Sequence, residues 1–169
     1  RAQLAFTVGG RLDSRPVQVG DRVRAGQRLA RIESAGFRNG LGAAVASRRD
    51  VAARLAQAKR DLRRMRTLTR QGVMPKARLE QVEAQVTSLE ALTSAARVRV
   101  AESWRTVRET ELRAPFDGVV TEVRLQPGEY AAPGRPVIFV SGAGALEARV
   151  EVPESVMSRA QVGQAVRLD

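Results

Sequence analysis

The chain of 169 residues is 43% hydrophobic but only 4% aromatic, carries a formal net charge of +11, and contains neither cysteine nor histidine. The absence of these two residue types excludes disulfides, thiolate chemistry, Cys/His metal sites and histidine-based catalytic triads. No apolar run of the roughly 18 residues that a membrane-spanning helix requires occurs in the sequence.

Residues 10–32 have the pattern of short β-strands joined by tight turns. Apolar side chains alternate or pair along this segment, as at Val17, Val19 and Val23, which is typical of half-buried strands. Gly20 and Gly26 separate the strand-like runs, and glycine supplies the positive φ that tight turns require. We therefore expect a strand, a turn, a short strand, a second turn and a third strand.

A helical pattern follows from about residue 43 to residue 70. Its apolar and small side chains recur at spacings of four and three, which predicts a coiled-coil seam; they are Val51, Leu55, Ala58, Leu62, Met65 and Thr69. The start of this helix is less sharply marked, because Gly36, Gly40 and Gly42 each disfavour helix by roughly 1 kcal/mol relative to alanine. Ser34 and Asn39 are both candidate N-caps.

A second helix is predicted over residues 76–110. The side chains at its heptad positions a and d, which form the seam, are Leu79, Val82, Val86, Leu89, Thr93, Ala96, Val100, Ser103 and Val107. In the short segment between the two helices, Gly72 is suited to end the first helix and Pro75 to the first turn of the second. So short a loop makes the helices antiparallel neighbours. At a rise of ~1.5 Å per residue, the arms of this hairpin reach about 45–50 Å.

An internal repeat decides the architecture. Residues 118–140 match residues 10–32 without a gap, at a constant offset of 108 residues. Each copy alone is too small to bury a core, so the two copies are expected to face each other in one flattened β-sandwich. We predict an α+β fold in which residues 1–34 and 111–141 form the sandwich and residues 35–110 form the hairpin between its halves.

The last residues predict the opening of another module. Residues 141–145 read as a linker, 146–152 as a strand, and 153–160 as a short helix, before a further strand ends at Leu168. We assign residues 142–169 to the start of a β-barrel. Because the chain begins inside a strand-like pattern, we interpret it as a fragment of a longer protein.

Four motifs in fixed order resemble those of the membrane fusion proteins, the HlyD-like periplasmic adaptors of Gram-negative tripartite pumps. They are VGDRVRAGQRL at residues 19–29, LRAPFDGVV at 112–120, PGE at 127–129 and VEVPE at 150–154. The resemblance covers essentially the whole chain. It implies that the split sandwich is lipoyl-like and that the hairpin and a β-barrel module belong to the same protein. Hairpin length is closer to the RND-pump branch than to the longer-hairpin branches.

The same resemblance implies a function without catalysis or cofactor. Such a protein lies in the periplasm, anchored to the inner membrane by a segment absent here. It joins an inner-membrane transporter to a TolC-like outer-membrane channel and self-associates as a trimer or hexamer. In the RND branch the hairpin tip carries Arg, then Leu four residues on, then Ser seven after that. Arg64 and Leu68 match the first two positions, but Pro75 replaces the serine. We expect Arg64, Leu68, Gly72, Val73, Met74 and Pro75 to contact the channel.

Four alternatives remain beside this interpretation. The adaptor could serve an ABC-type or type I export system instead of an RND pump. A biotinyl or lipoyl carrier needs a lysine at the turn joining its halves, whereas Lys59 and Lys76 lie in the hairpin. An enzyme is disfavoured because carboxylates such as Asp117 lie at turns without a convergent acidic cluster. A nucleic-acid scaffold is disfavoured because the charge comes almost wholly from arginine, as a coding bias produces, with no stacking aromatics.

Overall fold

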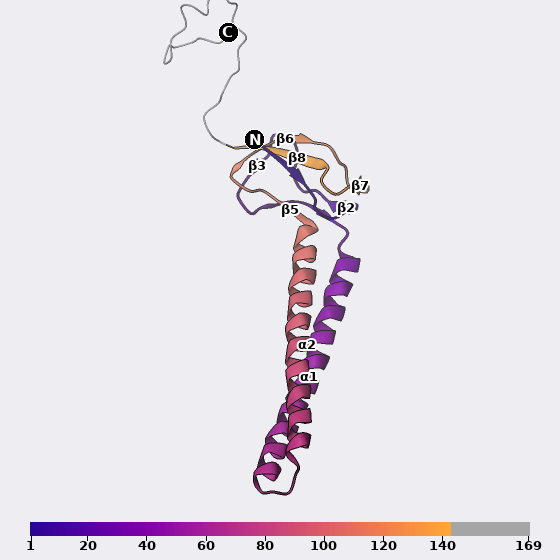
Figure 1. Cartoon of the computed structure of the whole chain (residues 1–169). Helices are drawn as coiled ribbons and strands as arrows, with labels where there is room; N and C mark the ends of the chain where they lie inside the picture. Colours follow the sequence, from indigo (N-terminus) through magenta and orange to yellow (C-terminus); the bar gives the residue numbers. More distant parts are fainter. Residues whose placement is uncertain (143–169) are drawn as a thin grey trace, which may run out of the picture.

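The computed structural model describes residues 1–142, which form two β-sheets and a long helical hairpin (Figure 1). The first half of the chain contains β1 (Ala2–Ala5), β2 (Gly10–Ser14), β3 (Arg22–Val23), β4 (Arg28–Ile32) and α1 (Ala35–Arg70). The second half contains α2 (Lys76–Glu109), β5 (Glu111–Arg113), β6 (Gly118–Val123), β7 (Tyr130–Ala131) and β8 (Pro136–Gly142). The predicted strand, helix and β-barrel of residues 143–169 lie outside the described residues.

Each sheet combines strands from both halves of the chain. One sheet has the order β1-β8-β6-β3 and the other the order β5-β4-β2-β7. The offset of 108 residues maps β2, β3 and β4 onto β6, β7 and β8, so exchanging the two halves converts one sheet into the other. The predicted sandwich built from two facing copies is confirmed. The repeat is also longer than predicted, because β1 and β5 occupy equivalent edge positions.

Backbone hydrogen bonds at the turns show the same symmetry between the two halves of the chain. The Gly20 amide donates to the Val120 carbonyl at 2.8 Å, and the Gly128 amide donates to the Leu12 carbonyl at 2.8 Å. Gly20 and Gly128 both have a φ of 96°, a conformation that glycine adopts without steric cost. Each half of the sandwich is therefore held closed by the other half.

The core lies between the two sheets and is poor in aromatic side chains, as the composition predicts. Fully buried side chains of the sandwich include Phe6, Leu12, Leu29, Ile32, Val120, Val137, Ile138 and Val140. Burying one such side chain contributes about 1.5–3 kcal/mol. Strands from both halves supply these residues, so neither half has a core without the other.

Helix α1 begins at Ala35, several residues before the glycine-free heptad pattern that starts near residue 43. Gly36, Gly40 and Gly42 lie inside α1, so the helix starts at the predicted beginning of the hairpin segment, residue 35, and extends beyond the pattern that is clear from residue 43. Phe37, between these glycines, packs on the sandwich core, and such packing outweighs the propensity cost of roughly 1 kcal/mol for each glycine. Ser34 occupies the N-cap position, although its side chain makes no cap hydrogen bond. Asn39 is within the helix and is excluded as the cap.

The predicted coiled-coil seam is confirmed along the hairpin. Ala58, Leu62 and Val86 are buried together, and four half-buried side chains pack against them: Leu55, Leu79, Val82 and Leu89. The buried Thr93 hydroxyl donates to the Leu89 carbonyl at 2.8 Å, which removes the cost of a polar group in the seam. With 36 and 34 residues, the helices extend about 50 Å from the sandwich (Figure 1). Neither helix contains an 18-residue stretch apolar enough to cross a membrane.

Candidate interaction site at the hairpin tip

The loop at the far end of the hairpin is a hydrogen-bonded helix terminus. The Gly72 amide donates to the Thr69 carbonyl, and the Val73 amide donates to the Leu68 carbonyl, each at 3.0 Å. This pair of bonds is the Schellman motif, which satisfies carbonyls left free at a helix end. Gly72 has a φ of 74°, so the predicted left-handed end of the first helix is confirmed. The loop therefore has a defined shape.

Pro75 lies at the N-cap of α2, one residue before the helical turn for which it was predicted. Its backbone is extended, with φ −63° and ψ 143°, and its carbonyl accepts a hydrogen bond from the Arg78 amide at 3.1 Å. The ring is exposed and carries no donor or acceptor. At the third tip position this protein therefore presents a flat apolar ring in place of a hydroxyl.

Arg64 is exposed but is not turned away from the partner helix. Its side chain is 68% exposed, and its Nη2 donates to Asp61 Oδ1 at 2.7 Å. It lines a surface hollow together with Arg78 and Val82 of α2. Asp61, one turn earlier on α1, lines the same hollow, so the ion pair holds the Arg64 guanidinium beside it.

The apolar members of the predicted tip set lie near the loop. Leu68 is half-buried and lies outside the Leu62 cluster, as expected for a residue flanking the seam. Val73 is 67% exposed, and Met74 is half-buried. The loop hydrogen bonds bring Leu68 and Val73 together, whereas Arg64 lies one helical turn further from the tip than Leu68.

Cations beside the tip were not among the predicted site residues. Arg66, Arg70 and Lys76 line one hollow together with Thr69 and Leu79. Helix α1 carries ten basic side chains against two carboxylates, an excess that the sequence interpretation ascribed to coding bias. The spacing in the sequence could have predicted this group, because Arg66 and Arg70 lie four residues apart and therefore share one face of the helix.

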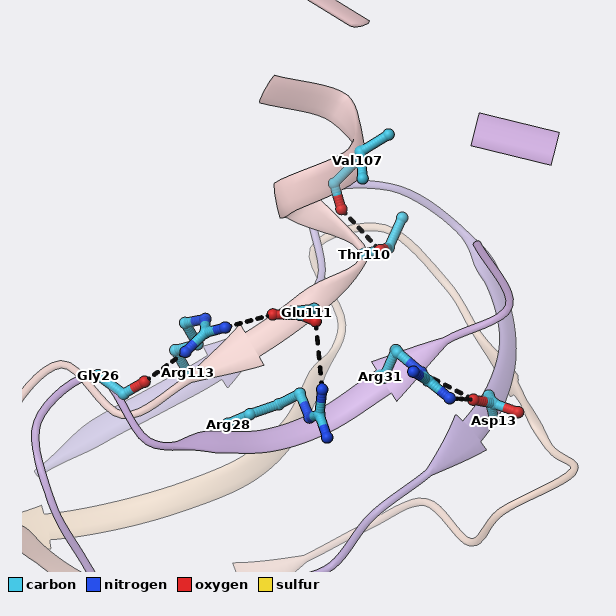
Figure 2. Close-up of polar contacts among 8 residues, drawn as sticks. All are labelled: Asp13, Gly26, Arg28, Arg31, Val107, Thr110, Glu111 and Arg113. Atoms are coloured by element: carbon cyan, nitrogen blue, oxygen red, sulfur yellow. Dashed lines mark hydrogen bonds and ion pairs between the residues drawn. The ribbon is translucent and has the colours of Figure 1, made fainter. Parts of the chain in front are cut away.

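Ion pairs and hydrogen bonds surround the point where α2 passes into β5 of the sandwich. Figure 2 shows Glu111, the first residue of β5, between Arg28 and Arg113. Arg113 Nη1 also donates to the Gly26 carbonyl at 2.7 Å, and the Thr110 hydroxyl donates to the Val107 carbonyl at 2.7 Å. Partial burial by itself raises the pKa of the Glu111 carboxyl, but the hydrogen bonds and charges of Arg113 and Arg28 outweigh it and hold the pKa below its ordinary value.

The chemistry of the tip is that of surface recognition. Within residues 1–142 no group of three or more His, Cys, Asp or Glu side chains is placed to hold a metal ion. What the hairpin presents is an exposed apolar loop flanked by guanidinium and ammonium groups. Apolar side chains beside arginines are enriched in protein interfaces.

A β-sandwich divided by a long antiparallel hairpin defines the barrel-sandwich hybrid class of membrane fusion proteins. The chain belongs to the CzcB-like barrel-sandwich hybrid domain family, whose family model matches residues 1–142. The resemblance to the membrane fusion proteins is thereby confirmed.

Individual relatives support the same assignment. The nickel-cobalt-cadmium resistance protein NccB of Alcaligenes xylosoxydans xylosoxydans is 32% identical over 152 residues, covering 86% of this chain and 36% of that protein. The cobalt-zinc-cadmium resistance protein CzcB of Cupriavidus metallidurans is 27% identical over 168 residues, covering 96% of this chain and 32% of that protein. The chain thus spans about a third of the length of these two relatives.

The crystal structure of MacA from Actinobacillus actinomycetemcomitans has the same fold. It superposes with a TM-score of 0.76 at 20% sequence identity, covering 96% of this chain and 58% of that chain.

Proposed function

We propose that this chain is the core of a periplasmic adaptor that links an inner-membrane transporter to an outer-membrane channel in a tripartite, RND-type efflux system. Membership of the CzcB-like family supports this proposal, as do the relatives named for metal resistance. The chain has no enzymatic activity of its own. Its longer parent protein lies in the periplasm and is anchored to the inner membrane by a segment outside this sequence.

The observation that carries the proposal is the separation of the tip from the sandwich. A continuous seam stiffens the hairpin, and the tip presents Val73 to solvent with 67% of its surface exposed. An apolar side chain at the end of a rod about 50 Å long buries little surface within its own chain. At this position the side chain is available for contact with a partner protein.

The tip set of Arg64, Leu68, Gly72, Val73, Met74 and Pro75 is proposed to contact a TolC-like channel. The sandwich, residues 1–34 and 111–141, is proposed to lie nearer the transporter, with residues 142–169 opening the β-barrel and residues 35–110 forming the hairpin. Several copies, as a trimer or a hexamer, are proposed to surround one channel. The exposed tips of a ring would then grip the channel end at repeated positions.

The experiment that tests this function uses the full-length protein in its own host. Deletion of the gene should lower the efflux of toxic metals or drugs, and the wild-type gene should restore it. A photo-crosslinking amino acid in place of Val73 should then capture an outer-membrane channel protein. Unchanged efflux in the deletion strain, with no channel captured from the tip, would exclude the proposed function.

A further inference from the structure

Five cations form a continuous row along one side of the distal hairpin. Lys59, Arg63, Arg66 and Arg70 recur at spacings of four, three and four residues, which places them on one face of α1. The fifth, Lys76, begins α2 and lines the same hollow as Arg66 and Arg70. We call these five residues the cationic row.

Helix α2 neutralises only part of the cationic row. Lys59 Nζ lies 2.7 Å from Glu90 Oε1, and Arg66 Nη2 lies 2.8 Å from Glu83 Oε1. Arg63, Arg70 and Lys76 form no ion pair within residues 1–142. Arg63 lies between the two paired cations, and Arg70 and Lys76 follow them towards the tip. The unpaired positive charge therefore extends from the middle of the hairpin to its tip.

Apolar side chains line two surface hollows between these cations. The buried side chains Leu62 and Val86 line the floor of one hollow between Arg63 and Arg66. The half-buried Leu79 lines the next hollow, between Arg66 and Lys76. Arg66 borders both hollows, which makes the row and the hollows one surface. Guanidinium groups around small apolar depressions are a composition enriched in protein interfaces.

The opposite side of the same helix is arranged differently. Arg54 pairs with Asp50 at 2.9 Å, and Arg64 pairs with Asp61 at 2.7 Å, each within α1. Their charge is compensated locally, whereas that of Arg63 and Arg70 is not. Arg54 and Arg64 therefore offer less free positive charge to an anionic partner than Arg63 and Arg70 do.

We infer that the cationic row is a docking surface for an acidic protein surface, namely the end of the outer-membrane channel that the proposed function places at the tip. This inference rests on that function and adds the chemistry of the partner. The row from Lys59 to Arg70 extends over about 16 Å at a helical rise of ~1.5 Å per residue. The partner presents at least two carboxylates over that length, with an apolar side chain between them for the hollow over Leu79.

A protein fits this surface better than a uniformly anionic one. Glu83 and Glu90 lie within the row, and their carboxylates repel phosphates spread evenly over a lipid surface or a nucleic acid. A folded partner can place its carboxylates opposite Arg63, Arg70 and Lys76 while keeping them away from the two glutamates.

The test is charge reversal in the full-length protein, read by photo-crosslinking from position 73 to the channel in cells. Arg63→Glu with Arg70→Glu should lower the channel crosslink about tenfold, because like charges then face each other at the interface. The matched control is Arg49→Glu with Arg60→Glu, which makes the same change of charge on α1 at two cations that also lack ion pairs within residues 1–142. The control should stay within about twofold of wild type.

Salt provides a second measurement in isolated membranes. Raising sodium chloride from about 50 mM to about 500 mM should weaken the wild-type crosslink and have less effect on the reversed variant. If Arg63→Glu with Arg70→Glu unfolds the hairpin by circular dichroism, the neutral pair R63Q and R70Q replaces it, and a smaller loss of the same sign is expected.

Two results would overturn the inference without touching the proposed function. One is a channel crosslink equally strong in the Arg63/Arg70 and Arg49/Arg60 variants. The other is loss of flotation with phosphatidylglycerol vesicles on charge reversal while the channel crosslink is unchanged, which would assign the row to lipid. Absence of any channel crosslink in wild type, with no efflux defect on deletion, would instead remove the proposed function and this inference with it.

Discussion

Arg66 of α1 and Glu83 of α2 are joined across the hairpin, with Nη2 and Oε1 2.8 Å apart. Lys59 and Glu90 repeat this bridge seven residues further from the tip on each helix. The sum of the two residue numbers is 149 in both pairs, as required by antiparallel helices in a single register. The bridges thus flank the seam at equivalent positions and mark its alignment.

These bridges specify alignment more than they contribute to stability. In a double-mutant cycle of Arg66→Ala and Glu83→Ala, we expect a coupling energy below about 1 kcal/mol, because both side chains are largely exposed. The coupling should vanish at about 1 M salt. Urea unfolding followed by helical circular dichroism measures it. A coupling that persists in high salt would mean that the pair is shielded from solvent.

Leu89 and Leu92 provide a matched test of the seam. Leu89 packs against the Leu62 cluster, whereas Leu92, three residues on, is 52% exposed. Leu89→Asp should destabilise the hairpin by at least about 2 kcal/mol, near the lower end of losses at packed leucines. Leu92→Asp should change stability by less than about 0.5 kcal/mol. Equal melting curves for the two variants would refute the heptad assignment.

Two glycines of the hairpin should respond to alanine with opposite signs. At Gly72, where φ is 74°, alanine should cost about 1–2 kcal/mol through left-handed strain. At Gly40, an exposed position within α1, alanine should stabilise the protein by roughly 0.5–1 kcal/mol. Thermal unfolding of both variants measures the difference. A neutral Gly72→Ala would show that the tip loop takes another conformation in solution.

The tip prediction is tested in the full-length protein by Arg64→Ala combined with Leu68→Ser. We expect lower efflux at wild-type expression and melting temperature, because Arg64 is exposed and the half-buried Leu68 lies outside the packed seam cluster. Arg60→Ala is the control, since Arg60 is exposed on the same helix and bonds only to Gln57. Normal efflux in the double variant would remove these residues from the contact. A lowered melting temperature would show that Leu68 shields the seam.

Glu111 predicts a pH dependence of stability. Its pKa in the folded protein is lowered from the unperturbed value of 4.5, so its ion pairs stabilise the fold above that value. This stabilisation is lost as the pH falls through the folded pKa. Glu111→Gln should therefore melt lower than wild type at neutral pH and approach it as the pH falls through the lowered pKa of Glu111. Glu80→Gln, at an exposed glutamate of α2 without an ion pair in residues 1–142, is the control. A constant difference at all pH values would contradict this account.

Sequence periodicity alone determined the architecture of this protein. Alternation with glycine turns, repeated after 108 residues, predicted the two halves of the sandwich, and heptad spacing predicted the Leu62 and Leu89 seam. These patterns are readable because each strand or helix must turn one face to a core, which leaves a local period in the residues. The left-handed Gly72 was predictable for the same local reason.

Only the tertiary structure decided the contacts between residues far apart in the chain. The packing of Phe37 on the sandwich core stabilises the first turns of α1, so the helix begins at Ala35 although these turns contain three glycines. Asp61 pairs with Arg64 within α1, and Glu83 and Glu90 pair with Arg66 and Lys59. Within residues 1–142, Arg63, Arg70 and Lys76 are left as the unpaired cations of the row. Whether a charge is compensated depends on which carboxylate lies within about 4 Å of it, and this depends on how the two helices are aligned and not on the sequence around either residue.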